Sequence, residues 1–132
     1  PNETTYFAFS YPFSYEESQN QMDEIESSFA SNTNPNLNLY FHREVIYYSV
    51  EGRKMEMMTI SSTDGITDER EAVPKGQDYK GIFPEAATKM RPYKFNESKK
   101  VVVFTSRVHT GETPGSHVLN GVIDLITDLK SS

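Results

Sequence analysis

His109 and Glu112 are the two side chains whose types and spacing favour metal chemistry in this sequence. They stand three positions apart in the stretch FTSRVHTGETPGS, residues 104–116. A histidine nitrogen and a glutamate oxygen are both ligands that zinc takes in proteins, and a catalytic zinc keeps one position open for water. The pair supplies two ligands, so a catalytic site needs a third from elsewhere.

Other interpretations of the same stretch are open on the residues alone. His-x-x-Glu pairs often arise by chance, so His109 can equally be a hydrogen-bonded histidine at a strand end. Glu112 would then only favour the positive start of a helix. GETPGS superficially resembles a phosphate-binding loop, but it lacks the lysine that should precede its serine or threonine. His117 is a weak candidate for a third ligand because it falls within the following helix.

A strand and a helix must position this turn. VVVFTSRV, residues 101–108, is apolar at successive positions, which predicts a central strand covered on both faces. Thr113 can cap a helix and Pro114 can occupy its first turn. The apolar residues that follow recur at helical spacing: Val118, Leu119, Val122, Ile123, Ile126 and Leu129. Strand, turn and helix form a unit of an α/β sheet, whose sites lie at the carboxyl ends of strands.

The first half of the chain predicts a helix and a hairpin. Ser14 and Glu17 make a capping box, and apolar spacing continues as a helix from about residue 15 to residue 30. Two β-rich runs within residues 41–60 flank Glu51 and Gly52, the kind of short connection that makes an antiparallel hairpin.

Two further stretches give weaker structural signals. YFAFSYPFSY, residues 6–15, is rich in aromatic residues but broken by Pro12, which suits an edge strand or its exit. Residues 61–99 show no sustained periodicity apart from a possible helical turn near PEAATKM. We interpret this long segment as a partly ordered insertion near the rim of a site. The fold class predicted is α/β: a partial mixed sheet with an antiparallel strand pair, one central strand and flanking helices.

Composition excludes several classes of partner. The net charge of -6 disfavours nucleic acid, because phosphate binding needs a basic face. The sequence has no cysteine, which removes disulfides and zinc held by thiolates. It shows neither a signal peptide nor an apolar run near the roughly 18 residues of a membrane span. We therefore expect a soluble, cytoplasmic protein with no membrane or nucleic-acid partner.

Four stretches, in order, resemble the cytosolic carboxypeptidases, a branch of the zinc metallocarboxypeptidases related to carboxypeptidase A. YFAFSYPFSY is similar to that family's passage from a small N-terminal β-domain into the catalytic domain, and HREVIYYSVEGRKMEMMTISS to its first strand pair. IFPEAATKMRPYKF is similar to a loop of the subgroup that removes branch-point glutamates from tubulin. SRVHTGETPGSHVLNGVIDLI resembles the first zinc motif and its helix.

The resemblance implies a domain assignment and a partial site. Residues 1–13 would end the N-terminal β-domain or a linker, and 14–132 would form the first part of a truncated catalytic domain with a carboxypeptidase-like sheet. His109 and Glu112 match the family's first two zinc ligands, while Thr110 stands where proline is usual.

The rest of the family's machinery is expected downstream of Ser132. It comprises a third zinc ligand, which is a histidine, an Asn-Arg pair that grips the substrate carboxylate, a substrate-clamping tyrosine and a general-base glutamate. No catalytic residue is therefore assigned within this chain. We expect the chain alone to be inactive and, with an open sheet edge and an apolar helix stripe, to self-associate.

The function implied by the resemblance is that of a cytoplasmic zinc metallocarboxypeptidase. It would hydrolyse C-terminal or branch-point glutamates from polyglutamylated proteins such as tubulin. One alternative is a catalytically inactive carboxypeptidase-like module that binds acidic tails. Another is a structural domain that never had a site.

Overall fold

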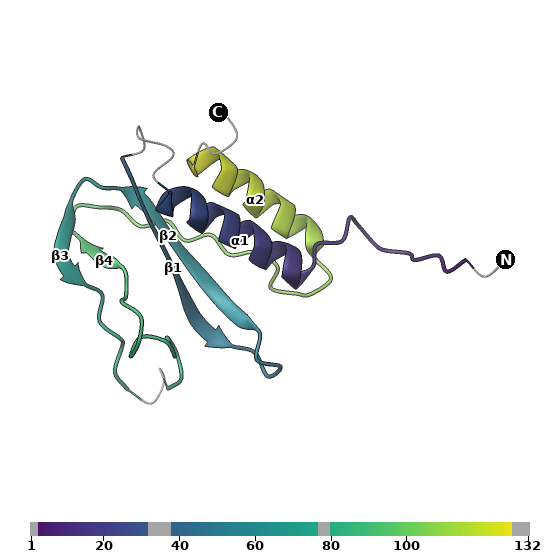
Figure 1. Ribbon diagram of the computed structural model, residues 1–132, viewed down its shortest axis with the longest axis horizontal. Coiled ribbons are helices and arrows are strands. Elements are labelled where there is room, and N and C mark those ends of the chain that lie inside the picture. Colours follow the sequence, from purple (N-terminus) through teal and green to yellow (C-terminus); the bar gives the residue numbers. More distant parts are fainter. Residues whose placement is uncertain (1–2, 32–37, 77–79, 128–132) are drawn as a thin grey trace. The chain divides into compact units, whose positions relative to one another are not determined.

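A computed structural model describes residues 3–31, 38–76 and 80–127 of the chain. Figure 1 shows its elements in chain order: α1 (Tyr15–Ala30), β1 (Leu39–Tyr48), β2 (Lys54–Ser62), β3 (Ile66–Arg70), β4 (Tyr93–Phe95) and α2 (Thr113–Thr127). The predicted α/β class is confirmed. No described helix has the length and apolar character needed to cross a membrane.

The described residues divide into two compact units. One contains residues up to 25 together with those from 101 onward, and the other spans residues 26–100. The predicted division between 1–13 and 14–132 concerns the domain organisation of the family and stays a prediction.

The predicted capping box starts helix α1. The Ser14 backbone N–H donates to Glu17 Oε2 at 2.6 Å, and the Glu17 N–H donates to Ser14 Oγ at 3.1 Å. Hydrogen bonds from Ser14 to the Glu17 carboxyl lower its pKa. Two backbone donors of the first turn thus gain partners, and the helix begins and ends where the sequence predicts.

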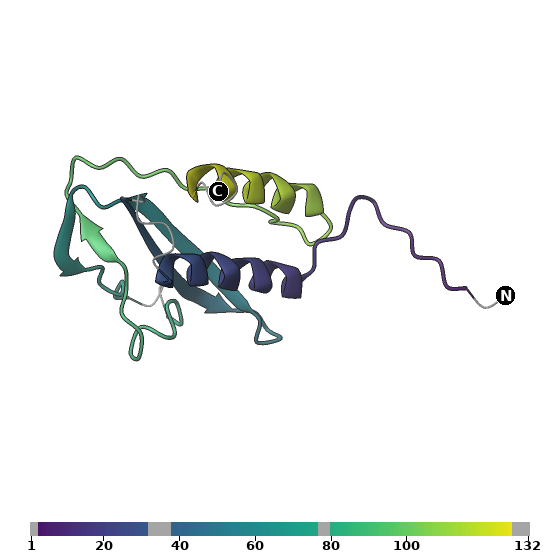
Figure 2. The same ribbon diagram turned by 45° about the horizontal axis from the view of Figure 1, so that its top comes forward.

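Strands β1 and β2 form the predicted antiparallel hairpin in the unit of residues 26–100. Their register runs from Leu39 opposite Ser62 to Tyr48 opposite Lys54, with an irregularity after Val45. Figure 2 shows the tight connection between them. Gly52 sits in this turn with φ near 75°, a left-handed conformation that glycine adopts without a steric penalty.

A buried arginine organises one face of the hairpin. Arg43 reaches both carboxylate oxygens of Glu56, with Nε–Oε1 and Nη2–Oε2 distances of 3.0 Å. Its Nη1 also pairs with Glu26 of α1 at 3.1 Å. On the same face, the Phe41 ring stacks on Phe29 with 4.8 Å between centroids. The arginine and aromatic contacts together attach the end of α1 to the hairpin.

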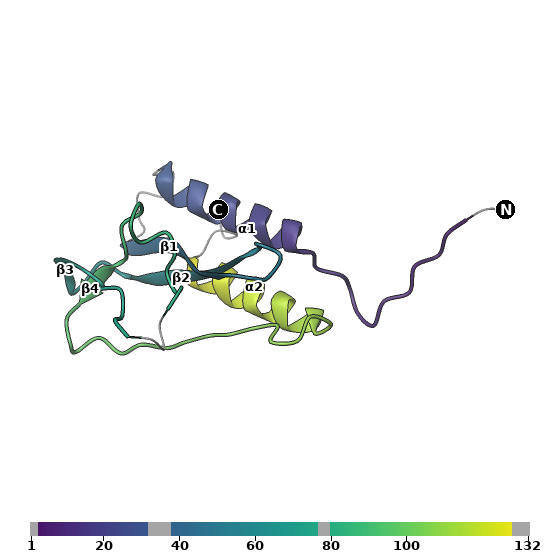
Figure 3. The same ribbon diagram turned by 90° about the horizontal axis from the view of Figure 1, so that it is seen from below.

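The segment of residues 61–99 contains a second sheet that the sequence did not predict. Strand β3 pairs antiparallel with β4, with Ile66 opposite Phe95 and Arg70 opposite Tyr93. Figure 3 shows the two short strands side by side. Both strands are short and carry no clear alternation, and their pairing joins residues far apart in sequence. The predicted helical turn near PEAATKM is present, because Lys89 N donates to Glu85 O at 2.8 Å.

The predicted central strand is wrong for this structure. Residues 101–107 form no strand, and the side chains of Val101 and Val103 are 84% and 77% exposed. A strand buried on both faces needs pairing partners and covering layers, and the described part of the chain supplies neither to this segment. Of the two alternatives for the aromatic segment, an edge strand or its exit, the strand is absent between residues 3 and 14, where Phe7 and Phe9 are exposed.

Helix α2 forms as predicted but buries a narrower stripe. It begins at Thr113, with Pro114 in its first turn, as expected for proline. Ile123 is buried, whereas Val118 and Ile126 of the predicted stripe are exposed. Leu129 lies outside the described residues.

We predict that Glu56→Gln destabilises the unit of residues 26–100 by about 3–5 kcal/mol, because it leaves the Arg43 guanidinium buried without its main counter-charge. Glu26→Gln is the matched control. It removes a carboxylate from the same arginine, but the Glu26 side chain is 55% exposed, so we expect a loss below about 1 kcal/mol. Urea unfolding of the three proteins measures the difference. Equal losses for both variants would contradict the prediction.

Candidate metal centre

The turn that carries His109 and Glu112 is closed by backbone hydrogen bonds. Glu112 N donates to His109 O at 3.1 Å, and Gly115 N donates to Glu112 O at 3.2 Å. The first bond folds the main chain back over three residues and leads directly into α2. It therefore brings the side chains of positions 109 and 112 to the same side of the turn.

The two predicted ligands are in contact. His109 Nδ1 lies 2.9 Å from Glu112 Oε1. Both side chains are exposed, at 76% and 62%, so a metal ion can reach them from solvent. An imidazole nitrogen and a carboxylate oxygen are both zinc ligands, bound at about 2.0–2.2 Å in a tetrahedral site, so the two atoms would move apart by roughly half an ångström to share one zinc ion.

A third ligand is not found near them. The described residues contain no group of three or more His, Cys, Asp and Glu side chains able to hold a metal. His117, the weak third candidate, instead places its Nε2 atom 3.4 Å from the Tyr11 carbonyl oxygen. Its ring meets Phe13 edge-on, with centroids 5.4 Å apart. His117 therefore contacts the segment before α1, and the pair remains a two-ligand arrangement.

Two neighbours that the sequence did not single out shape this turn. Arg107 donates from Nε and Nη2 to the Thr110 carbonyl oxygen, at 3.1 and 3.0 Å. Gly115 lets the start of α2 come close to Ser106, because a Cβ added there would lie 3.2 Å from Ser106 Oγ. Both residues lie within three positions of the His-x-x-Glu pair, and this nearness was the available signal in the sequence.

Comparison with known proteins supplies the family. The zinc carboxypeptidase family matches residues 38–130, a range that includes both His109 and Glu112. The chain belongs to this family. The predicted zinc carboxypeptidase segment is thereby confirmed at the level of the family, and membership implies zinc as the metal.

The relatives narrow the resemblance to the cytosolic carboxypeptidases. The chain is 40% identical over 127 residues to cytosolic carboxypeptidase-like protein 5 of Bos taurus and 39% identical to that of Homo sapiens. It is 31% identical over 120 residues to cytosolic carboxypeptidase 6 of Homo sapiens. These alignments cover 93%, 93% and 91% of this chain but 14%, 14% and 17% of the relatives. The chain thus spans a small part of the length of these carboxypeptidases.

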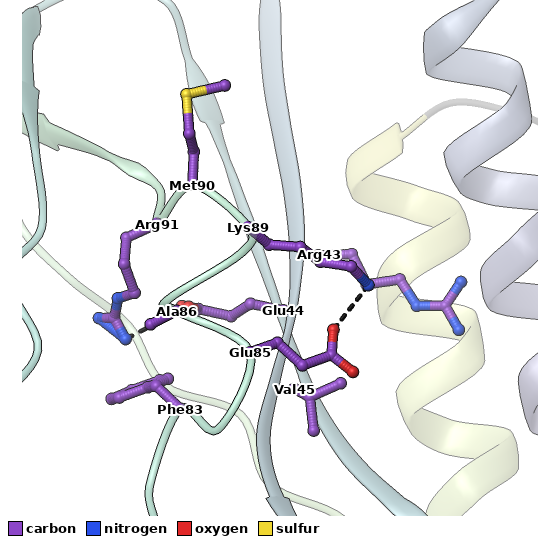
Figure 4. Close-up of a pocket in the computed structure, with 9 residues that line it drawn as sticks. All are labelled: Arg43, Glu44, Val45, Phe83, Glu85, Ala86, Lys89, Met90 and Arg91. Carbon is purple, nitrogen blue, oxygen red and sulfur yellow. Dashed lines mark ion pairs between the residues drawn. The ribbon is translucent and has the colours of Figure 1, made fainter.

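A second polar cluster lies in the unit of residues 26–100, where residues 83–91 fold against β1. Figure 4 shows the ion pair between Arg91 and Glu44. The pair is 3.2 Å long, and the two side chains are 11% and 9% exposed. The Arg91 guanidinium also lies over the Phe83 ring, 3.4 Å from its centroid. Burial raises the pKa of the Glu44 carboxyl, an effect that the charge of Arg91 opposes. The cluster fixes the loop to the strand.

His42 lies on the same face of β1 as Glu44 and is held neutral by its surroundings. Burial lowers the pKa of its imidazole, and the positive charges of Arg70 and Arg91 lower it further. Glu26 acts in the opposite direction with a smaller effect. His42 is therefore a poor proton acceptor in the folded chain and serves as a packed ring, parallel to that of Tyr40.

We predict that His42 makes the chain less stable as the pH falls. An unfolded histidine takes up a proton near its ordinary pKa of 6.5, while the folded state resists protonation. The unfolded state therefore binds more protons below about pH 6.5, and stability is lost as the pH falls toward the depressed folded pKa. Urea unfolding between about pH 7.5 and about pH 5.5 should show a shallower loss for His42→Gln than for the wild type.

The Glu44 carboxyl titrates in both the wild type and His42→Gln, so its contribution cancels from the difference between their pH slopes. His117→Gln, which replaces an exposed histidine of the other unit, is the control. Identical pH slopes for the wild type and His42→Gln would show that the folded state accepts the charged imidazole.

Proposed function

We propose that His109 and Glu112 are two ligands of the zinc ion of a cytoplasmic metallocarboxypeptidase that removes glutamate from polyglutamylated proteins such as tubulin. The observation that carries the metal assignment is the 2.9 Å approach of His109 Nδ1 to Glu112 Oε1 on an exposed turn. Family membership supports zinc. The substrate rests on the resemblance of residues 82–95 to the loop of the branch-point subgroup.

The chain's own residues would hold the metal without a large rearrangement. His109 offers a ring nitrogen and Glu112 a carboxylate oxygen, and the hydrogen bond between their backbones keeps the two close together. When bound, zinc would polarise the scissile carbonyl and lower the pKa of a water molecule. Glu112 adds a negative charge to the site, which strengthens cation binding on this exposed surface.

The proposed enzyme needs groups that the described residues do not provide. A third ligand and a general base are both required for peptide hydrolysis by a zinc carboxypeptidase. Among the described residues, no further His, Asp or Glu joins the pair. We therefore propose that these groups belong to a longer protein and that the chain by itself turns over no substrate.

The competing function is that of an inactive module that binds acidic tails. The absence of a complete metal site among the described residues favours this module. The net charge of -6 does not separate the two functions, because both require binding of an acidic tail, which a negative chain repels unless a metal or a local cation offsets the repulsion. Zinc content and turnover of the longer protein distinguish the two.

We predict that His109→Ala and Glu112→Ala each abolish zinc retention and activity in a carboxypeptidase that carries this chain as its segment. Changes beyond the first coordination shell already cost about 10–100-fold, so loss of a ligand should cost more than about 100-fold. Metal analysis and peptide turnover measure the effect. His117→Ala is the matched control and should keep both zinc and activity. Near wild-type turnover of either ligand variant would refute the assignment.

We further predict that a carboxypeptidase carrying this chain as its segment releases glutamate from synthetic glutamylated peptides. It should release a branch-point glutamate faster than a linear C-terminal glutamate. A chelator should stop the reaction, and the isolated chain should release no glutamate even with added zinc. Mass spectrometry of the products identifies which residue leaves. Chelator-sensitive release by the isolated chain would mean that the catalytic groups lie within it, and equal rates on both peptides would remove the branch-point preference.

A further inference from the structure

Arg107 combines an unusual backbone conformation with an unusual set of contacts. Its φ of 58° lies in the left-handed region, which costs free energy for any residue with a side chain. Glycine would adopt this conformation without that cost. The arginine at this position therefore needs an explanation in its side chain.

The guanidinium of Arg107 donates hydrogen bonds from both of its edges. Nε and Nη2 donate to one acceptor, the Thr110 carbonyl oxygen, at 3.1 and 3.0 Å. Nη1 donates to the Phe13 carbonyl oxygen, directly before the capping residue of α1. One planar group thus connects the turn of residues 107–112 to the segment that enters α1, and both contacts lie within the same compact unit.

Because Thr110 lies between His109 and Glu112, its carbonyl belongs to the backbone loop that carries them. The loop is closed on one side by the Glu112 N–H on His109 O. The bonds from Arg107 fix the intervening peptide from the other side. With both in place, the backbone that carries positions 109 and 112 cannot rearrange without breaking a hydrogen bond.

We propose that Arg107 is a positioning residue for the His109–Glu112 pair. Its guanidinium acts through the Thr110 carbonyl and sets the separation of the two metal ligands, an inference that rests on the proposed metal function. The role requires the planar fork of arginine. A lysine keeps the positive charge but cannot direct two parallel N–H groups to one carbonyl while a third reaches Phe13.

Two substitutions distinguish the positioning role from an effect of the positive charge alone or of the backbone strain alone. Arg107→Lys keeps the charge and loses the fork, while Arg107→Gly relieves the backbone strain and loses the side chain. Arg53→Lys is the matched control. Arg53 lies in the β1–β2 turn, pairs with Glu51 on the surface, and belongs to the other unit.

The experiment is a titration of the full chain with zinc chloride, followed by NMR at the His109 and Glu112 signals, with thermal unfolding recorded alongside. We expect both Arg107 variants to bind zinc about 10–100-fold more weakly, the usual effect of removing support for a ligand. Arg53→Lys should bind as the wild type does. The unfolding midpoint of Arg107→Gly should not fall, which separates positioning from general stability.

Amide hydrogen exchange supplies a readout without metal. The Glu112 amide, which donates to His109 O, should exchange faster in Arg107→Lys than in the wild type or in Arg53→Lys. Unchanged exchange together with unchanged zinc affinity would overturn the positioning role.

The two proposals fail in distinguishable ways. Zinc binding that is lost in His109→Ala and Glu112→Ala but unaffected by Arg107→Lys would refute the role of Arg107 and leave the metal assignment in place. Zinc-induced shifts that persist in both ligand variants would refute the metal assignment itself. Faster Glu112 exchange in Arg107→Lys would then still show that Arg107 holds the turn.

Discussion

Pairing of buried charge is the constraint on which the unit of residues 26–100 depends. Among its described residues, Val45 is the one hydrophobic side chain of the buried core. The hairpin therefore places charged groups on both faces, with Arg43 against Glu56 on one and Arg91 against Glu44 on the other. Buried ions are tolerated when each has a partner of opposite charge. This requirement fixes both the end of α1 and the loop of residues 83–91 against β1.

The candidate metal centre follows a different principle, because its side chains are exposed and its geometry comes from the backbone. The hydrogen bond between the Glu112 amide and the His109 carbonyl keeps the two candidate ligands close together. Hydrogen bonds from Arg107 to Thr110 hold the same loop. A site of this kind needs little apolar core nearby. The backbone turn at the start of α2 is enough to hold the two candidate ligands in contact.

Local signals in the sequence predicted much of the fold and of the site. The capping box at Ser14 fixed the start of α1, since its two hydrogen bonds join residues three apart. Gly52 marked the hairpin turn in the sequence, and in the structure it adopts the left-handed conformation that glycine favours. The β3–β4 pairing escaped prediction because it joins short polar segments across more than twenty intervening residues. The contact of Arg107 with Phe13 was likewise hidden, since it links distant parts of the chain.

The sequence by itself determined α1, the β1–β2 hairpin, α2 and the identity of the two candidate ligands, because each depends on hydrogen bonds or periodicity within a few residues. The tertiary structure decided what those elements contact. It left VVVF, residues 101–104, exposed rather than in a central strand, because burial of a strand requires neighbours that apolar composition cannot supply. It also kept His117 away from the metal pair and turned its ring toward Phe13. Spacing along the chain selects candidates, but packing decides which of them meet.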